Sequence, residues 1–126
     1  AVFLEKLDDM QTLADENNLC VEAYIGWPTE DEMTQIAARV DRLLVHAYVK
    51  SPEIAADYLD ERLTWLAGLS APPVIWVIFS VEDVFMGPWI SEHSIDEAEE
   101  ILSNDLETSS LDGLVSGFQY FTYSLF

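Results

Sequence analysis

The chain has 126 residues, half of them hydrophobic, so it is long enough for one domain with a buried core and too apolar to be disordered. It carries 24 acidic residues against 5 basic ones, a net charge of −19. This charge argues strongly against binding to nucleic acid or to an anionic membrane surface, because both are polyanions. We expect most of the carboxylates to lie on outward helix faces, where they favour solubility, and adaptation to high salt is a variant of the same interpretation.

A single cysteine, Cys20, excludes an intramolecular disulfide and a cysteine-based zinc site. Its apolar neighbours Leu19 and Val21 predict a buried position. No stretch approaches the roughly 18 consecutive apolar residues of a transmembrane helix. The chain begins at Ala1, with neither an initiator Met nor a basic segment leading into an apolar one. We therefore expect that an upstream segment was removed or that the numbering is that of a trimmed chain, and the location stays open between cytoplasm and secretion.

The first half of the chain predicts two helix–strand pairs. Apolar residues recur at helical spacing from Phe3 to Ala14, and Asn17-Asn18 can end that helix in a left-handed conformation. Residues 19–25 predict a strand. Thr29-Glu30-Asp31-Glu32 is a capping box that opens a second helix, and residues 42–49 predict the second strand.

The second half continues the alternation. Ser51-Pro52-Glu53 predicts a capped helix start with Pro in its first turn, and Gly68 predicts its end. The run from Val74 to Phe79 has no polar break, which is typical of a strand buried on both faces. The remaining elements that we expect are a loop over 84–92, a helix opened by a capping box at 94–97, a polar turn over 103–112 and a last strand over 113–126.

The order αβαβαβαβ predicts one α/β domain over residues 1–126, with a four-stranded parallel sheet and right-handed crossovers. An open sheet of four strands leaves two unpaired edges. We expect two chains to pair edge to edge and to close a barrel about a two-fold axis, as a homodimer. The alternative is a doubly wound sheet that helices cover on both faces.

Three segments carry a resemblance to a known architecture: V-E-A-Y-I-G-W, P-V-I-W-V-I-F-S-V-E-D and G-F-Q-Y-F-T-Y. The chain resembles the C-terminal half of a glycoside-hydrolase-like TIM barrel, its strands corresponding to the fifth to eighth. The resemblance implies a nucleophilic carboxylate after the seventh strand, at Glu82 or, less well, Asp83. It also implies a partner acid after the fourth strand, which this chain lacks. Since two carboxylates must flank a glycosidic bond, a hydrolase requires the symmetry mate of Glu22 or Glu82 in a dimer.

Side-chain alternation groups further residues on common faces of the predicted strands. If these faces point inward, they form an acidic and aromatic cavity with Glu82, and aromatic rings with carboxylates and an amide suit a carbohydrate-like ligand. Trp27 and Trp89 are expected on its rim. The candidate catalytic residues are Glu82 and Glu22, and the candidate ligand-binding residues are Tyr24, Trp27, His46, Tyr48, Asp83, Trp89, Gln119 and Tyr123.

Each of these residues also has a purely structural interpretation: a hydrogen-bond network for Glu22, a core position for His46, packing for the tyrosines, and a loop or subunit contact for Trp89. No glycine-rich phosphate loop and no G-x-S-x-G motif occur, so we expect no nucleotide cofactor, and nothing local demands a metal. Three functions remain open. The first is binding of a small carbohydrate-like molecule, the second is glycosidase-type hydrolysis in an assembled barrel, and the third is self-association without catalysis.

Overall fold

The computed structural model describes residues 2–122, and in them helices and strands alternate. The elements are α1 (Val2–Glu16), β1 (Glu22–Ile25), α2 (Glu30–Ala37), β2 (Arg42–Ala47), η1 (Pro52–Ile54), α3 (Ala55–Ala67), β3 (Val74–Ser80), α4 (Gly87–Glu92), α5 (Ile95–Thr108), η2 (Asp112–Leu114) and β4 (Val115–Phe121). The predicted α/β class is confirmed. Within these residues no helix has the length and apolar character needed to cross a membrane.

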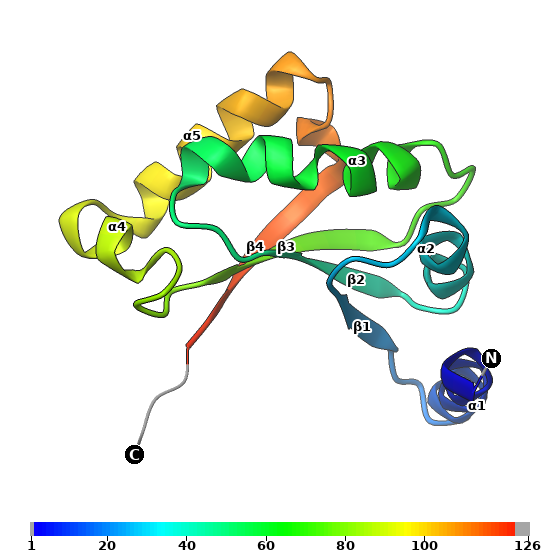
Figure 1. The fold of residues 1–126 in the computed structure, drawn as a ribbon. Helices are drawn as coiled ribbons and strands as arrows, with labels where there is room; N and C mark the ends of the chain where they lie inside the picture. Colours follow the sequence, from blue (N-terminus) through cyan, green and yellow to red (C-terminus); the bar gives the residue numbers. More distant parts are fainter. Residues whose placement is uncertain (1, 123–126) are drawn as a thin grey trace.

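The four strands form one parallel sheet in the order β1-β2-β3-β4. When strand order follows chain order and every crossover is right-handed, all the connecting helices fall on one face. Figure 1 shows α2, α3 and α5 on that face, which we call the outer face, while α1 continues the arc of helices beyond β1. The opposite face, which we call the open face, carries no helix among the described residues. The sheet is therefore not doubly wound.

The core lies between the outer face and the helices. Alternate strand residues point into it and are almost fully buried, among them Leu43, Val45, Ile75, Val77 and Phe79. Helix residues at helical spacing meet them, among them Leu59, Leu63, Leu66, Leu102 and Leu106.

The uninterrupted apolar run of β3 has a different cause from the predicted one. Helices cover only its outer face, so Val74, at the start of the open face, is half exposed. Ile78 lies in the middle of the open face and is buried without any helix above it. The run thus marks a strand in the interior of the sheet, not a strand between two helix layers.

Several predicted boundaries are confirmed. Thr29 and Glu32 form the reciprocal capping box of α2. Asn18 follows α1 with a φ of 55°, in the left-handed region that asparagine tolerates. Gly68 is the C-cap residue of α3, as predicted.

Other boundaries are wrong. β1 begins at Glu22 because the Val21 amide donates to the Asp41 carboxylate, at 2.8 Å, and not to a neighbouring strand. Cys20, ahead of it, is exposed and not buried. Ser51 makes no side-chain cap, and Pro52–Ile54 is a 3-10 turn before α3.

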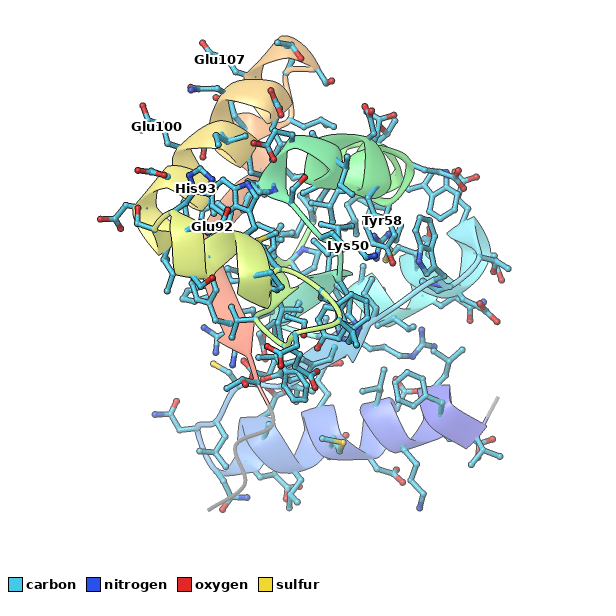
Figure 2. All side chains as sticks on the ribbon, turned by 60° about the vertical axis from the view of Figure 1, so that its left-hand side comes forward. Lys50, Tyr58, Glu92, His93, Glu100 and Glu107 are labelled. Carbon is cyan, nitrogen blue, oxygen red and sulfur yellow. The ribbon has the colours of Figure 1, made fainter. Side chains whose placement is uncertain are left out.

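Helix is also more extensive near residues 84–112 than predicted. A short helix, α4, replaces the second half of the predicted loop. α5 continues to Thr108 because Leu102 and Leu106, four residues apart, extend its buried stripe through polar residues that resemble a turn. Figure 2 shows Glu100 and Glu107 of α5 pointing away from the body of the protein, as expected for the excess carboxylates.

Candidate functional site

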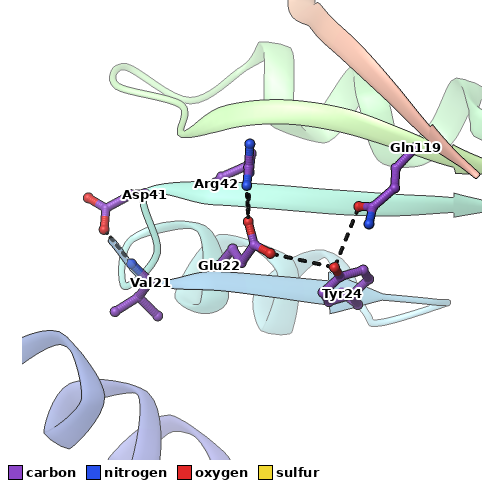
Figure 3. A network of polar contacts seen from close by, with 6 residues as sticks. All are labelled: Val21, Glu22, Tyr24, Asp41, Arg42 and Gln119. Atoms are coloured by element: carbon purple, nitrogen blue, oxygen red, sulfur yellow. Dashed lines mark hydrogen bonds and ion pairs between the residues drawn. The ribbon is translucent and has the colours of Figure 1, made fainter. Parts of the chain in front are cut away.

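The amino end of the open face is organised by an ion pair. Glu22 opens β1 and lies beside Arg42, which opens β2, because the two strands pair in that register. The Arg42 Nε donates to Glu22 Oε2 at 2.7 Å, and a second guanidinium nitrogen binds the same oxygen. The side chains of both residues are more than one third exposed, so water screens the pair. Glu22 is therefore part of a partly exposed polar network (Figure 3).

Trp76 extends this network toward β4. The Arg42 guanidinium lies 4.9 Å from the centre of the Trp76 ring, within the range of a cation–π contact. The ring covers Gly117 on the neighbouring strand, where a Cβ would come within 3.0 Å of three ring atoms. A register shift after Ile75 skips Ser116 and sets Gly117 opposite Trp76. A side chain at residue 117 would therefore displace the indole.

Tyr24 joins the two edges of the sheet across the open face. Its hydroxyl lies 3.5 Å from Glu22 Oε1 and 3.5 Å from Gln119 Oε1. Both contacts are long, and because the hydroxyl has a single hydrogen, it can donate to only one of these oxygens at a time. Gln119 belongs to β4 and Tyr24 to β1, two strands that do not pair with each other. Three predicted site residues thus meet as expected (Figure 3).

The carboxyl end of the open face is aromatic. His46 stacks on Tyr48 with ring centres 4.7 Å apart and planes 1° from parallel. Tyr48 in turn contacts Phe121 and Phe85, with ring centres at 6.0 and 5.4 Å. Burial, and then the positive charge of Arg62, lower the pKa of His46 below its usual value of 6.5. A neutral imidazole is therefore favoured in the folded protein.

Glu82 follows β3 at this same edge. The buried Ser80 hydroxyl donates to Glu82 Oε1 at 3.2 Å, and the Glu82 amide lies 3.4 Å from the same hydroxyl oxygen. Glu82 and Asp83 line a hollow of about 290 Å³ together with Val81, Val84 and Thr122. A carboxylate held in this way at the carboxyl edge of a parallel strand can accept hydrogen bonds from ligand hydroxyl groups.

The two candidate catalytic carboxylates do not form a pair within one chain. Glu22 aligns through Arg42 with Val74, the first residue of β3, whereas Glu82 lies two residues beyond the end of that strand. The strand between them spans about 20 Å at roughly 3.3 Å per residue. Carboxyl groups that cleave a glycosidic bond are about 5–9.5 Å apart. Glu22 therefore belongs to the opposite end of the sheet from Glu82.

Trp27 lies in the loop after β1 and is 57% exposed. Its indole Nε1 donates to the Tyr58 hydroxyl at 2.9 Å, and the rings of the two residues meet edge to face. Beneath it lies Arg62 of α3, which is fully buried. Trp27 is thus fixed from below by two residues of α3.

Trp89 does not lie beside Trp27 but on α4. It packs against the core and stacks on His93, with ring centres 4.1 Å apart. His93 also pairs with Glu97 at 3.0 Å, four residues on. The position of Trp89 agrees with a packing role, and no contact joins Trp89 to the other candidate residues in the part of the chain that the structure describes.

Sequence reasoning missed Arg42, Trp76 and Arg62. For the first two the signal was present, since alternation from Leu44 and Ile78 sets them on the open face. Arg62 is four residues from Tyr58 and from Leu66 and so falls within the apolar stripe of its helix, which marks it as a candidate for burial.

The remaining predicted residue, Tyr123, lies outside the described residues. Among residues 2–122, no cluster of three or more His, Cys, Asp or Glu side chains is arranged to hold a metal ion. Comparison with protein-family models, with curated proteins and with solved structures found no match to this chain. The glycoside-hydrolase-like resemblance therefore stays a hypothesis.

Proposed function

We propose that the chain is half of a parallel (β/α) barrel, that a second copy completes the barrel, and that the assembly binds a small, carbohydrate-like molecule at the carboxyl edge of its strands. One observation carries the proposal. All the crossover helices lie on the outer face, and the open face combines two buried apolar residues, Leu44 and Ile78, with charged and aromatic side chains. A sheet with these properties is typical of the inner wall of a barrel.

The helix α1 supports closure at one edge of the sheet. Leu7 and Ala14 are buried on one side of this helix, and Asp8 forms an ion pair with Arg39 at 2.9 Å. The flank of this apolar stripe on α1 is exposed, with Phe3 at 53%, Met10 at 50% and Leu13 at 60%. Because α1 lies beyond β1, this stripe has no strand to cover within residues 2–122 (Figure 1).

The last strand supports closure at the other edge. The residues of β4 on the outer face, Val115, Phe118 and Tyr120, pack against the core and yet stay only partly buried. In a two-fold dimer, β4 of each copy would pair with β1 of the other, and α1 would cover the outer face of that β4. Each chain thus supplies both contact surfaces, α1 with β1 and the outer face of β4, and a two-fold homodimer would form the β4–β1 contact twice.

The ligand class follows from the carboxyl edge. The His46–Tyr48 stack, the exposed ring of Trp27 and the carboxylates of Glu82 and Asp83 lie at or beyond the ends of the strands. Aromatic rings pack on the apolar faces of sugar rings, and carboxylates accept hydrogen bonds from their hydroxyl groups. The edge therefore suits a small polyhydroxylated ligand better than a nucleotide, whose phosphates the carboxylates would repel.

The oligomeric state tests the closed barrel. We expect a dimer in sedimentation equilibrium, and more dimer as NaCl rises, because salt screens the repulsion between two chains of charge −19. Leu13→Glu removes an apolar contact from both seams. At about 1.5 kcal/mol for each leucine, the dimer Kd should rise about a hundredfold or more. Ile54→Glu, a change at another residue that is 50% exposed, is the control and should leave the Kd unchanged. A monomer at every salt concentration contradicts the closed dimer.

Ligand binding needs a separate test. Titration of the wild-type protein with a panel of neutral oligosaccharides, followed by calorimetry and by tryptophan fluorescence, should show binding to at least one of them. Glu82→Gln and Tyr48→Phe should weaken that binding, while the ion-pair variant Arg39→Gln should not. If no saccharide binds to a protein that does dimerise, self-association without a ligand is the better account.

A glycosidase-type reaction is the second candidate, and the Ser80–Glu82 contact favours it. This contact orients one carboxylate at the edge where barrel enzymes place their chemistry. The second carboxylate must then be Glu82 of the other copy, since Glu22 lies at the opposite end of the strands. Turnover of an oligosaccharide that Glu82→Gln abolishes, in a dimer that still folds, would support this reaction. Activity that survives the substitution removes Glu82 from the mechanism.

A further inference from the structure

Arg62 is a buried cation without an anionic partner. It is fully buried on α3, and none of the ion pairs found within residues 2–122 involves it. Its Nη1 donates to the Gly26 carbonyl oxygen at 2.7 Å and its Nη2 to the Tyr58 carbonyl oxygen at 3.2 Å, while its Nε has no partner. Burying a charge without a counter-ion is unfavourable, so Arg62 is a poor choice for stability alone.

The contacts of Arg62 point to its role. Its guanidinium lies 4.1 Å from the centre of the Trp27 ring and 5.1 Å from the centre of the Tyr58 ring. The Gly26 carbonyl that it binds immediately precedes Trp27. Together with the hydrogen bond from the indole to the Tyr58 hydroxyl, these contacts fix both the backbone and the ring of one loop residue.

The exposed side of Trp27 is therefore held in one orientation. One face of the ring lies on the guanidinium, so the exposed 57% of the residue is its other face and its outer edge. The loop that carries it follows β1, at the carboxyl edge of the sheet. Because the indole is already ordered, a ligand that stacks on it does not have to immobilise it.

The charge behind the ring restricts the ligand. A cation on the exposed face of the Trp27 ring would compete with the guanidinium for the same π electrons and would be repelled by its charge. An anionic ligand would meet the field of a protein with 24 acidic residues. A neutral ring with an apolar face avoids both penalties.

We propose that Trp27 is a preformed platform on which the apolar face of a neutral sugar ring stacks, and that Arg62 is the positioning residue that holds it. This inference rests on the proposed carbohydrate-like ligand and adds to it a defined subsite and a preference for uncharged sugars. Arg62 does not touch the ligand, since it has no exposed surface.

The experiment titrates wild-type protein with cellotetraose, xylotetraose and laminaritetraose, and with the cationic tetramer of glucosamine. We expect a neutral tetramer to bind. In about 0.5 M NaCl, which screens the attraction between the acidic protein and the cationic tetramer, we expect the cationic one to bind at least tenfold more weakly. Trp27→Ala should raise the Kd of the neutral tetramer about tenfold, through lost stacking. Arg62→Met, which keeps an unbranched apolar side chain of similar length, should raise it about 2- to 10-fold, because the indole must then be ordered on binding. Ile54→Ala, another half-exposed apolar residue, is the control and should change nothing.

Stability separates a positioning role from a structural one. Urea unfolding of Arg62→Met should give a midpoint close to that of wild type, because the loss of the hydrogen bonds to Gly26 and Tyr58 is offset by the removal of a buried charge without a counter-ion. If that variant does not fold, Tyr58→Phe removes only the acceptor of the indole hydrogen bond and should raise the Kd in the same direction.

The outcomes are distinct. Binding that Trp27→Ala leaves unchanged overturns the platform and leaves the proposed function in place. Binding that Trp27→Ala weakens, but Arg62→Met and Tyr58→Phe do not, overturns the positioning role. Equal affinity for the cationic and neutral tetramers overturns the preference for uncharged sugars. No binding of any tetramer by wild-type protein overturns the platform and the carbohydrate-like ligand together.

Discussion

Gly117→Ala tests the packing of the open face most directly. A Cβ at this position would lie 2.8, 2.9 and 3.0 Å from three atoms of the Trp76 ring, where ordinary contacts begin near 3.4 Å. The indole cannot move freely, because the Arg42 guanidinium lies over it at 4.9 Å. Overpacking of this kind costs about 1–3 kcal/mol. Alanine also restricts the backbone of the unfolded chain, which stabilises the folded state by about 0.5–1 kcal/mol, because Gly117 has no positive φ that alanine would have to adopt.

The net expectation is a free energy of unfolding lower by about 0.5–2 kcal/mol. Equilibrium unfolding in urea, followed by tryptophan fluorescence, should show a midpoint lower by roughly 0.3–1 M with an unchanged slope. Near-ultraviolet circular dichroism should change as well, because the Trp76 ring leaves its place. Gly113→Ala is the control: nothing lies within 4 Å of its added Cβ.

A double-mutant cycle isolates the contact itself. In a Trp76→Leu background the clash is absent, so Gly117→Ala should be neutral or stabilising by up to about 1 kcal/mol. The coupling energy between the two residues should then be about 1–3 kcal/mol. If Gly117→Ala is as stable as wild type, with an unchanged near-ultraviolet spectrum, the ring does not cover Gly117, and the packing of the open face described above is refuted.

Three further substitutions test other parts of the structure. The pKa of His46 is lower in the folded protein than its usual value of 6.5 in the unfolded chain. As the pH decreases below 6.5, the unfolded chain therefore takes up the proton first, and the free energy of unfolding decreases. His46→Gln should flatten this dependence between pH 6.5 and 5 in urea titrations, and parallel curves would contradict it. Thr29→Ala removes the cap of α2 and should cost about 0.5–2 kcal/mol by urea unfolding, whereas Thr34→Ala, within the same helix, should cost less. Gly87→Ala sets a Cβ 2.8 Å from the Glu82 carbonyl oxygen, a backbone atom that cannot rotate away, and should cost about 3 kcal/mol by thermal unfolding; a loss below 1 kcal/mol would argue that the turn before α4 is loose.

The fold class could be predicted because its signals are local. The capping box at Thr29 and the left-handed Asn18 are decided by residues within a few positions of each other. The end of α5 could not be predicted in the same way. Its polar residues favour a turn in isolation, and only the packing of Leu106 against the core, a tertiary contact, keeps them helical.

The layering of the sheet was less accessible to prediction. A continuous apolar run is expected for any strand in the interior of a parallel sheet, whether or not helices cover both of its faces. The run in β3 therefore could not distinguish a doubly wound sheet from one with a bare face. The difference lies in strand order, which depends on the direction of each crossover and not on the residues of the strand.

The candidate site shows the same division. Alternation along single strands correctly groups Glu22 with Tyr24 and His46 with Tyr48. It does not reveal that Arg62 reaches Gly26, because these residues are 36 positions apart and belong to a helix and a loop. Composition even argues against a buried cation in a chain with only 5 basic residues.

The consecutive strand order also governs how the molecule opens. Each strand pairs only with its neighbours in sequence, so β2 and β3 have two partners and β1 and β4 only one. Local opening should then start at the two ends of the chain, much as a solenoid of repeats loosens from its terminal units. Amide hydrogen exchange would be slowest in β2 and β3, where exchange requires unfolding of the whole domain. It would be faster in β1 and β4, and a second chain that pairs with these edges would slow both of them together.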